Sequence, residues 1–322
     1  MKRLLLTLLA LALTFGATFA QGDGAAEETR MTLRAEMLRM INRDRQKIGL
    51  APLELDPDAS SVADAYCRVQ IRNRTSGHFT LDGQTPYMRY SFAGGNDGLS
   101  ENAAAWSANF GFSDRALLDM MRRSQDAMMN EVPPHDGHRK SILDPHATHV
   151  GIGVAWEGGE FRIAQEFIRR YVDWGRPLPR NAAVGERVLC SGRPVPGYEI
   201  EAITVHHKSF PQAMPASVAN TIGSYSLPGN RREYLPRLKT FYRHHADGAV
   251  EEVREEYSDG RRGDFQMADD GGFAFAVPFP DGPGVYTVVV WVHARGAHET
   301  IAASNVSIRV EAAPVRVSYG SR

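Results

Sequence analysis

Apolar side chains recur every three or four positions in the first half of the chain, which is the pattern of amphipathic helices. One such stretch runs from about 31 to 48 and ends at Gly49, a suitable helix stop. A second begins at Asp56-Pro57, where the aspartate can cap the helix, and it runs to about residue 72. A third follows Ser113 and continues through residue 129. The sequence therefore predicts several helices before residue 130.

The stretch 134–156 joins a helical pattern to a strand pattern. It predicts a turn, a short helix that Asp136 can cap, and an apolar strand from Val150 onward. A hairpin turn and a returning strand follow to about residue 171. Helices plus a small sheet are therefore expected over residues 31–174.

Beyond this region the pattern changes to strands. The proline-rich stretch 175–184 has the composition of a linker. After it, runs of β-branched and aromatic residues alternate with turn signals roughly every ten residues. The clearest runs are 198–205 and 285–293, followed by 303–310, and 272–277 alternates small and large apolar residues, whereas 226–270 is polar and irregular. We predict an all-β sandwich of immunoglobulin-like type over residues 185–313.

Length and composition fit a globular protein of two domains. The chain has 322 residues, of which 43% are apolar and 23% charged, and its formal net charge is -1. Because there is no basic excess, we expect neither a nucleic-acid partner nor attraction to an anionic membrane.

The first twenty residues have the three parts of a secretory signal peptide. Lys2 and Arg3 precede the apolar run 4–15, and a small-residue cleavage site ends at Ala20. The alternative is an uncleaved membrane anchor, but the run is short for a span. Removal of residues 1–20 leaves a secreted or periplasmic protein without a membrane span.

The two cysteines, Cys67 and Cys190, allow two interpretations. An exported protein can join them in one disulfide. They fall in different predicted domains, however, and two separate buried thiols are at least as good an interpretation, because cysteine packs as a small apolar residue. No papain-like or caspase-like signature surrounds either one, so a catalytic thiol is not expected.

Five short motifs occur in order along the predicted first domain. They are Ile41-Asn42 with Arg45 and Gly49-Leu50-Ala51-Pro52-Leu53; His78-Phe79-Thr80-Leu81-Asp82-Gly83-Gln84-Thr85-Pro86 with Arg89; Ser100-Glu101-Asn102; Gly137-His138-Arg139-Lys140-Ser141-Ile142-Leu143; and Val150-Gly151-Ile152-Gly153-Val154 with Gln165-Glu166-Phe167. Together, over about residues 33–174, they resemble the bacterial form of the CAP superfamily, whose unit is also called the SCP domain. Serine stands at 100 for the usual glycine and at 141 for the usual asparagine.

The resemblance implies an α-β-α sandwich with a surface cleft, and hence an α+β fold class for the whole chain. In many members the cleft holds two histidines and two acidic residues that can bind a divalent metal. His78, Glu101 and His138 match three of these positions. The fourth, an acid on the helix before His138, has no clear match, and Asp119 and Asp126 are the nearest candidates. We therefore expect His78, Glu101 and His138 to share one pocket.

The chemistry of these residues agrees with a metal site. Two imidazoles and a carboxylate form a reasonable first shell for zinc, with one position left for water or a ligand. A simpler alternative needs no metal, because a buried Glu101 that accepts hydrogen bonds from His78 and His138 would hold the loops together. The neighbouring histidines at 135, 146 and 149 are expected to face solvent.

Two classes of function stay open. We favour a non-enzymatic module that binds an extracytoplasmic ligand, either a lipid, a peptide, a glycan or a protein, in the His/Glu cleft. The alternative is a metal-dependent hydrolase of peptide, lipid or cell-wall material. Neither His-Glu-x-x-His nor Gly-x-Ser-x-Gly occurs in the sequence, so catalytic residues stay unassigned.

Overall fold

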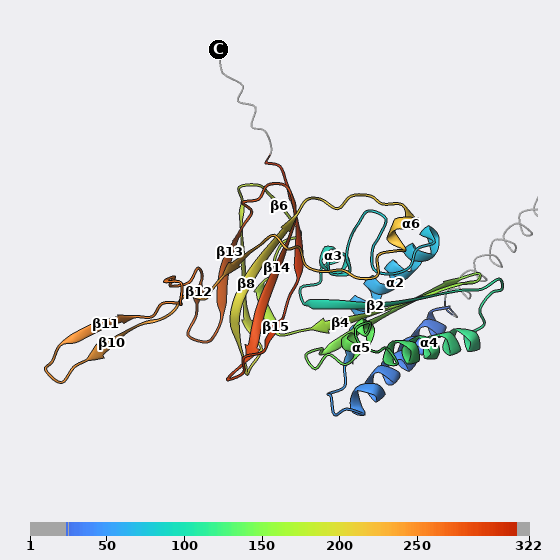
Figure 1. Cartoon of the computed structure of the whole chain (residues 1–322), viewed down its shortest axis with the longest axis horizontal. Helices are drawn as coiled ribbons and strands as arrows, with labels where there is room; N and C mark the ends of the chain where they lie inside the picture. The colour runs from blue at the N-terminus through green and yellow to red at the C-terminus, as the bar shows by residue number, and fades with distance from the viewer. Residues whose placement is uncertain (1–23, 25, 314–322) are drawn as a thin grey trace, which may run out of the picture. The chain divides into compact units, whose positions relative to one another are not determined.

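The structure is a computed structural model that describes residues 24 and 26–313. Helices and strands are mixed along it (Figure 1). The predicted signal peptide lies outside the described residues. No helix among those described is long and apolar enough to cross a membrane.

The chain folds into two compact units, each built from separate segments. The first contains the described residues up to Arg74, then Asn102–Pro145 and Gly151–Gln165. The second contains Thr75–Glu101, His146–Val150 and the described residues from Glu166 onward.

The predicted helices of the first unit are all present. The first covers residues 26–46 and is followed by a turn that ends at Gly49. The others are α2 (Pro57–Asn73), α4 (Asp114–Met129) and the short α5 (Gly137–Ile142). Asp56 caps α2 by accepting the N–H of Ala59, and Ser113 caps α4 in the same way. These starts were readable because the capping residue and the apolar period coincide.

A four-stranded sheet has the order β1-β3-β4-β2. Its strands are β1 (Glu54–Leu55), β2 (Gly98–Ser107), β3 (His149–Glu157) and β4 (Glu160–Arg169). Two glycines of β3 let α2 lie directly on the strand. A Cβ atom at Gly151 would lie 2.5 Å from the Cβ of Ala59, and one at Gly153 would lie 2.3 Å from the carbonyl carbon of Ala63. Any side chain at either position would push the helix away.

The second unit contains one short helix near its start, α3 (Pro86–Phe92), and the strands after residue 171. One sheet has the order β12-β13-β7-β5. A larger one has the order β6-β16-β14-β8-β9, with β15 also paired to β14. The bounds are β5 (Val172–Arg176), β6 (Asn181–Ala183), β7 (Arg187–Pro194), β8 (Tyr198–Lys208), α6 (Ala216–Ala219), β9 (Arg231–Tyr234), β10 (Thr240–His244), β11 (Val250–Arg254), β12 (Gln266–Met267), β13 (Phe273–Pro278), β14 (Gly284–Ala294), β15 (Thr300–Ala302) and β16 (Val306–Glu311).

Side chains from both of these sheets form one hydrophobic core. Cys190 and Phe275 belong to the first sheet, and Val205, Tyr286 and Val288 belong to the second. In Figure 1, β8 and β14 run side by side, and Val205 pairs with Val288 in their antiparallel ladder. Two sheets on a shared core are the arrangement expected of a β-sandwich. The immunoglobulin-like topology stays a prediction.

Three details of the second unit differ from the predicted pattern. The stretch predicted as a linker is ordered, because β5 extends to Arg176 and Leu178 is buried. The polar stretch 226–270 contains the four strands β9 to β12. The last strand begins at Val306 rather than 303, and just before it the side chain of Ser304, not its backbone, bonds to β14: its Oγ accepts the N–H of Val290 at 2.9 Å.

Cys67 and Cys190 are two separate buried thiols. Cys67 packs with small residues of the first unit, such as Ala63 and Ala164. Cys190 lies in the core of the second unit, where burial raises the pKa of its thiol to about 12. The structure therefore agrees with the second of the two interpretations.

Candidate functional site

His78 and Glu101 form a buried pair in the second unit. His78 lies in the loop between α2 and α3, and Glu101 lies in β2. The Nδ1 atom of His78 is 2.9 Å from Oε1 of Glu101. The two side chains are 8% and 0% exposed. The fold thus brings together two of the three predicted site residues, although 23 positions separate them in sequence.

Arg89 of α3 binds both members of this pair. Its Nη1 donates to the carbonyl of His78 at 2.6 Å, and its Nη2 donates to Oε2 of Glu101 at 2.5 Å. Burial alone would raise the pKa of Glu101, but the charge of Arg89 and the hydrogen bond with His78 outweigh it, so this pKa lies below its ordinary value. Glu101 is therefore an anion with a partner on each oxygen.

A second carboxyl group lies beside this anion. Glu166 of β4 is fully buried, and within the described residues neither of its oxygens has a hydrogen-bond partner of good geometry. Burial, and then the negative charge of Glu101, raise the pKa of Glu166 well above its ordinary value. Arg89 balances only one negative charge, so the neutral acid is the favoured form of Glu166.

His138, in the first unit, has a carboxylate partner of its own. Its Nδ1 is 2.5 Å from Oε1 of Glu131. The other oxygen of Glu131 accepts the N–H of His138 at 2.9 Å and that of Arg139 at 3.3 Å. Asp136 precedes α5, as predicted, but its side chain makes no capping hydrogen bond. The predicted cap is therefore corrected: Glu131 both caps the helix and holds the imidazole.

A line of buried amides connects Asp44 with the backbone of His138. Gln125 Nε2 donates to Asp44 at 3.0 Å, and Gln165 Nε2 donates to Gln125 at 3.0 Å. Asn102 Nδ2 then donates to Gln165 at 3.1 Å and to the carbonyl of His138 at 3.0 Å. All five residues belong to the first unit. This relay ties α5 to the interior of the unit.

The expected fourth acid has different surroundings from those predicted. Asp119 pairs with Arg122, and its side chain is 48% exposed. Asp126 is exposed on α4. The carboxylate next to His138 is instead that of Glu131, just after the end of α4. The ten residues before Asp136 contain two acids, Asp126 and Glu131. This short list is the sequence signal that could have identified Glu131.

The predicted metal ligands fall in two different units. Within residues 24 and 26–313, no group of three or more His, Cys, Asp or Glu side chains is placed to hold a metal ion. His78 and Glu101 belong to one unit and His138 to the other. Their common pocket and the metal therefore stay predictions.

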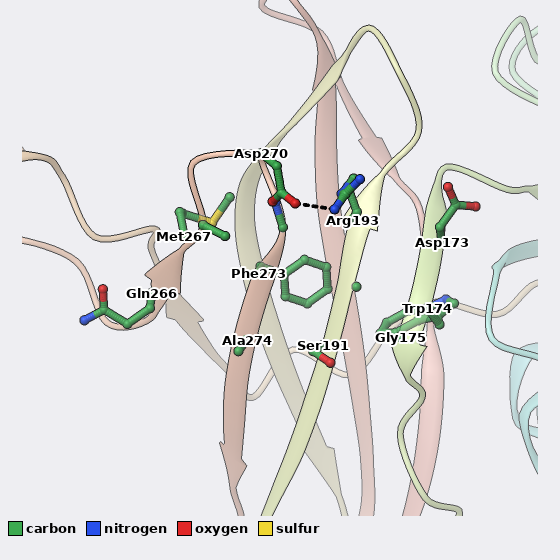
Figure 2. Close-up of a pocket in the computed structure, with 13 residues that line it drawn as sticks. Asp173, Trp174, Gly175, Ser191, Arg193, Gln266, Met267, Asp270, Phe273 and Ala274 are labelled. Carbon is green, nitrogen blue, oxygen red and sulfur yellow. Dashed lines mark hydrogen bonds and ion pairs between the residues drawn. The ribbon is translucent and has the colours of Figure 1, made fainter.

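A separate hollow lies on the strands of the second unit (Figure 2). It has a volume of about 700 Å³ and includes residues of β5, β7, β12 and β13. Figure 2 shows Trp174 and Phe273 along it and an ion pair between Arg193 and Asp270. None of the predicted site residues lines this hollow.

Comparison with known proteins finds similarity in the region before residue 168. Residues 38–167 match the cysteine-rich secretory protein family, CAP. The uncharacterized protein YkwD of Bacillus subtilis (strain 168) is 28% identical over 161 residues, which are 47% of this chain and 56% of that protein. The chain thus spans little more than half the length of this relative. Both findings support the predicted CAP domain, and the family match ends at residue 167.

Two solved structures are similar to part of the chain. One is an extracellular protein containing a SCP domain from Bacillus anthracis str. Ames, with 20% identity, a TM-score of 0.33, and coverage of 42% of this chain and 40% of that one. The other is an outer surface protein from Borrelia burgdorferi, with 23% identity, a TM-score of 0.35, and coverage of 44% of this chain and 93% of that one.

Proposed function

We propose that this chain is an exported, non-enzymatic binding protein whose CAP region takes an extracytoplasmic ligand at His78 and His138. One observation carries the proposal: each imidazole has its Nδ1 held by a carboxylate, His78 by Glu101 and His138 by Glu131. In such a pair the carboxylate fixes the tautomer and the orientation of the ring. Each ring then has Nε2 as its atom for binding a ligand.

The ligand that we propose for these imidazoles is a divalent metal such as zinc. Metal-bound histidines almost always direct their other ring nitrogen to a carboxylate, carbonyl or water. Glu101 already has a partner on each oxygen, so we assign it the role of orienting His78 rather than that of a direct ligand. Glu131 has the same role toward His138. A bound metal would supply an electrophilic position at which a lipid, peptide, glycan or protein oxygen could bind.

Binding is favoured over catalysis by the state of the nearby acids. A general base works best with a pKa near the operating pH. The pKa of Glu101 is lowered, so it is a weak base, and its two oxygens already have His78 and Arg89 as partners. We propose that the strands after residue 184 form a binding or spacing module of immunoglobulin-like type, and that the protein acts in the periplasm or outside the cell.

The alternative is a metal-dependent hydrolase of peptide, lipid or cell-wall material. Glu131 is the residue that favours it, because its side chain is 23% exposed and lies beside an imidazole. Turnover of pooled peptide, ester and glycan substrates with and without zinc separates the two. Zinc-dependent turnover that is lost in His138→Ala would replace our proposal by the hydrolase.

Calorimetric titration with zinc tests the metal. The mature chain is compared with His78→Ala, His138→Ala and the matched control His149→Ala. We expect binding by the mature chain and the control and at least about tenfold weaker binding by the other two. Equal binding in all four would place the metal at none of these three histidines and would overturn the proposed site.

A further inference from the structure

The loop that carries His78 is covered by a segment from the later part of the chain. Residues 210–227, the cover segment, lie between β8 and β9 in the same compact unit as His78. The N–H of Met214 donates to the carbonyl of Leu81 at 2.8 Å. The N–H of Ser76 donates to Oδ1 of Asn220 at 2.8 Å. The cover segment thus follows the His78 loop and contacts it at several points.

Gly83 shows how closely the two segments approach. Its φ is +79°, and a Cβ atom there would lie 2.8 Å from the carbonyl oxygen of Gln212 and 2.9 Å from the Cβ of Pro211. Only glycine fits such an approach in that conformation. The loop residue is therefore adapted to the presence of the cover segment.

Tyr225 is the residue of the cover segment that reaches the His78–Glu101 pair. Its hydroxyl oxygen accepts the backbone N–H of Glu101 at 2.6 Å. Its ring lies edge-on to the imidazole of His78, with ring centroids 5.0 Å apart. The carbonyl of the next residue, Ser226, accepts a hydrogen bond from the hydroxyl of Tyr87 at 3.2 Å. One tyrosine therefore contacts both the residue that holds His78 and the imidazole itself.

Between its two ends the cover segment has few buried residues. Ala219 is its only fully buried residue, whereas Gln212, Pro215, Val218 and Asn220 are exposed. Segments with few buried contacts open locally at a lower free energy than the whole fold. Packing of Phe210 and Leu227 on Tyr87 and Met88 anchors the two ends, so Tyr225 lies next to one anchor.

From these contacts we infer that Tyr225 is a positioning residue of the His78 site and that the cover segment limits access to His78. The inference rests on the proposal that His78 is a ligand-binding residue. It goes further in giving the strand-rich part of the chain a role at that site. Without residues 210–227, the side chain of His78 would be more accessible to a ligand.

The test measures access to His78 without any ligand. The full mature chain is treated with diethyl pyrocarbonate, and the rate of modification of each histidine is obtained by peptide mass mapping. His138 has its own carboxylate partner and belongs to the other unit, so it is the internal reference. The variants are Tyr225→Ala, Tyr225→Phe and the control Tyr242→Ala, at a tyrosine that is 63% exposed on β10.

We expect Tyr225→Ala to raise the rate at His78 by about tenfold relative to His138, the effect of losing one hydrogen bond and one aromatic contact. Tyr225→Phe keeps the ring and should raise it by about threefold. Tyr242→Ala should leave the ratio unchanged. Unchanged ratios in both Tyr225 variants, or equal rises at His78 and His138, would overturn the inference.

If Tyr225→Ala does not fold, Tyr225→Phe decides the question alone. Its side chain has nearly the same shape, so the fold is expected to persist while the acceptor for Glu101 is lost. A rise confined to His78 supports the inference, and no rise overturns it. Because no metal or ligand is used, the result is independent of the zinc titration. The proposed function and this inference can therefore fail separately.

Discussion

The carboxylate of Glu131 binds His138 twice, at the backbone N–H (2.9 Å) and at Nδ1 of the ring (2.5 Å). One side chain therefore starts α5 and orients the imidazole. Glu131→Ala removes both contacts, and we expect the free energy of unfolding to fall by about 1–2 kcal/mol. Thermal or denaturant unfolding measures this.

Asp119→Ala is the matched control for that change. Asp119 also carries a carboxylate near His138 in sequence, but it makes only an exposed pair with Arg122. Such pairs contribute little, so the expected loss is below about 0.5 kcal/mol. A larger loss in Asp119→Ala than in Glu131→Ala would contradict the assignment of Glu131.

Arg89 is the cation that makes a buried Glu101 tolerable. Arg89→Met leaves Glu101 as an uncompensated buried anion, which is expected to cost about 3–5 kcal/mol of stability. Arg89→Lys keeps the charge but cannot contact His78 and Glu101 with two separate nitrogens. We expect it to lie between Arg89→Met and the unchanged protein in denaturant unfolding.

The effect of Arg89→Met should depend on pH. The pKa of Glu101 is lowered in the fold, so its contribution is present above the unfolded pKa and is lost as the pH falls through the folded pKa. The variant has already lost that contribution. The gap in stability between the two proteins should therefore narrow on going from pH 7 to pH 4, and a gap that widens would contradict the ion pair.

For Glu166 we expect the opposite dependence of stability on pH. Its pKa is raised in the fold, so the stability linked to its proton is fully present below the unfolded pKa and is lost as the pH rises toward the folded pKa. Glutamine has no proton to lose. Glu166→Gln should therefore melt about 2–4 °C above the unchanged protein at pH 8 and show no such gain at pH 4.

The control for this experiment is Glu157→Gln, at an exposed residue at the end of β3. It should melt like the unchanged protein at both pH values. A gain of equal size in both variants would point to net charge rather than to the buried acid. Lower stability of Glu166→Gln at pH 8 would mean that the carboxylate form is needed.

The burial of the two thiols predicts that they do not react in the folded protein. Cys67 and Cys190 are both 0% exposed, and burial raises the pKa of Cys190 to about 12. Neither should react with Ellman's reagent at pH 8 in the folded protein, and both should react in guanidinium chloride. If reaction in guanidinium requires prior reduction, a disulfide joins them after all.

The sequence was most informative where one local signal decides the structure. Asp56 and Ser113 were readable as caps because each precedes an apolar period of the right length. The pairing of His78 with Glu101 followed from motifs rather than from local chemistry, since only the fold brings the two segments together.

Other features depend on contacts between distant segments and gave no local pattern. Tyr225 is 124 residues from Glu101, and nothing in its surroundings marks it as a site residue. The stretch 175–184 has the composition of a linker because it contains two prolines and a glycine, yet Arg180 donates hydrogen bonds to the carbonyls of Gly94 and Gly95. Amino-acid composition indicates only which local structure a stretch favours. Contacts with distant segments decide which structure it adopts.

The amide relay that ends at His138 has an acceptor at each end, the carboxylate of Asp44 and the carbonyl of His138. Asparagine and glutamine amides can point either way, but an ionised aspartate only accepts hydrogen bonds. Burial opposes the charge on Asp44, yet hydrogen bonds from Lys47 and Gln125 keep its pKa below the ordinary value. Gln125 and Gln165 must therefore turn their NH₂ groups toward Asp44, and Asn102 donates both to Gln165 and to the carbonyl of His138. A single carboxylate at 44 thus orders polar groups that are spread over 94 positions of the chain, from residue 44 to residue 138.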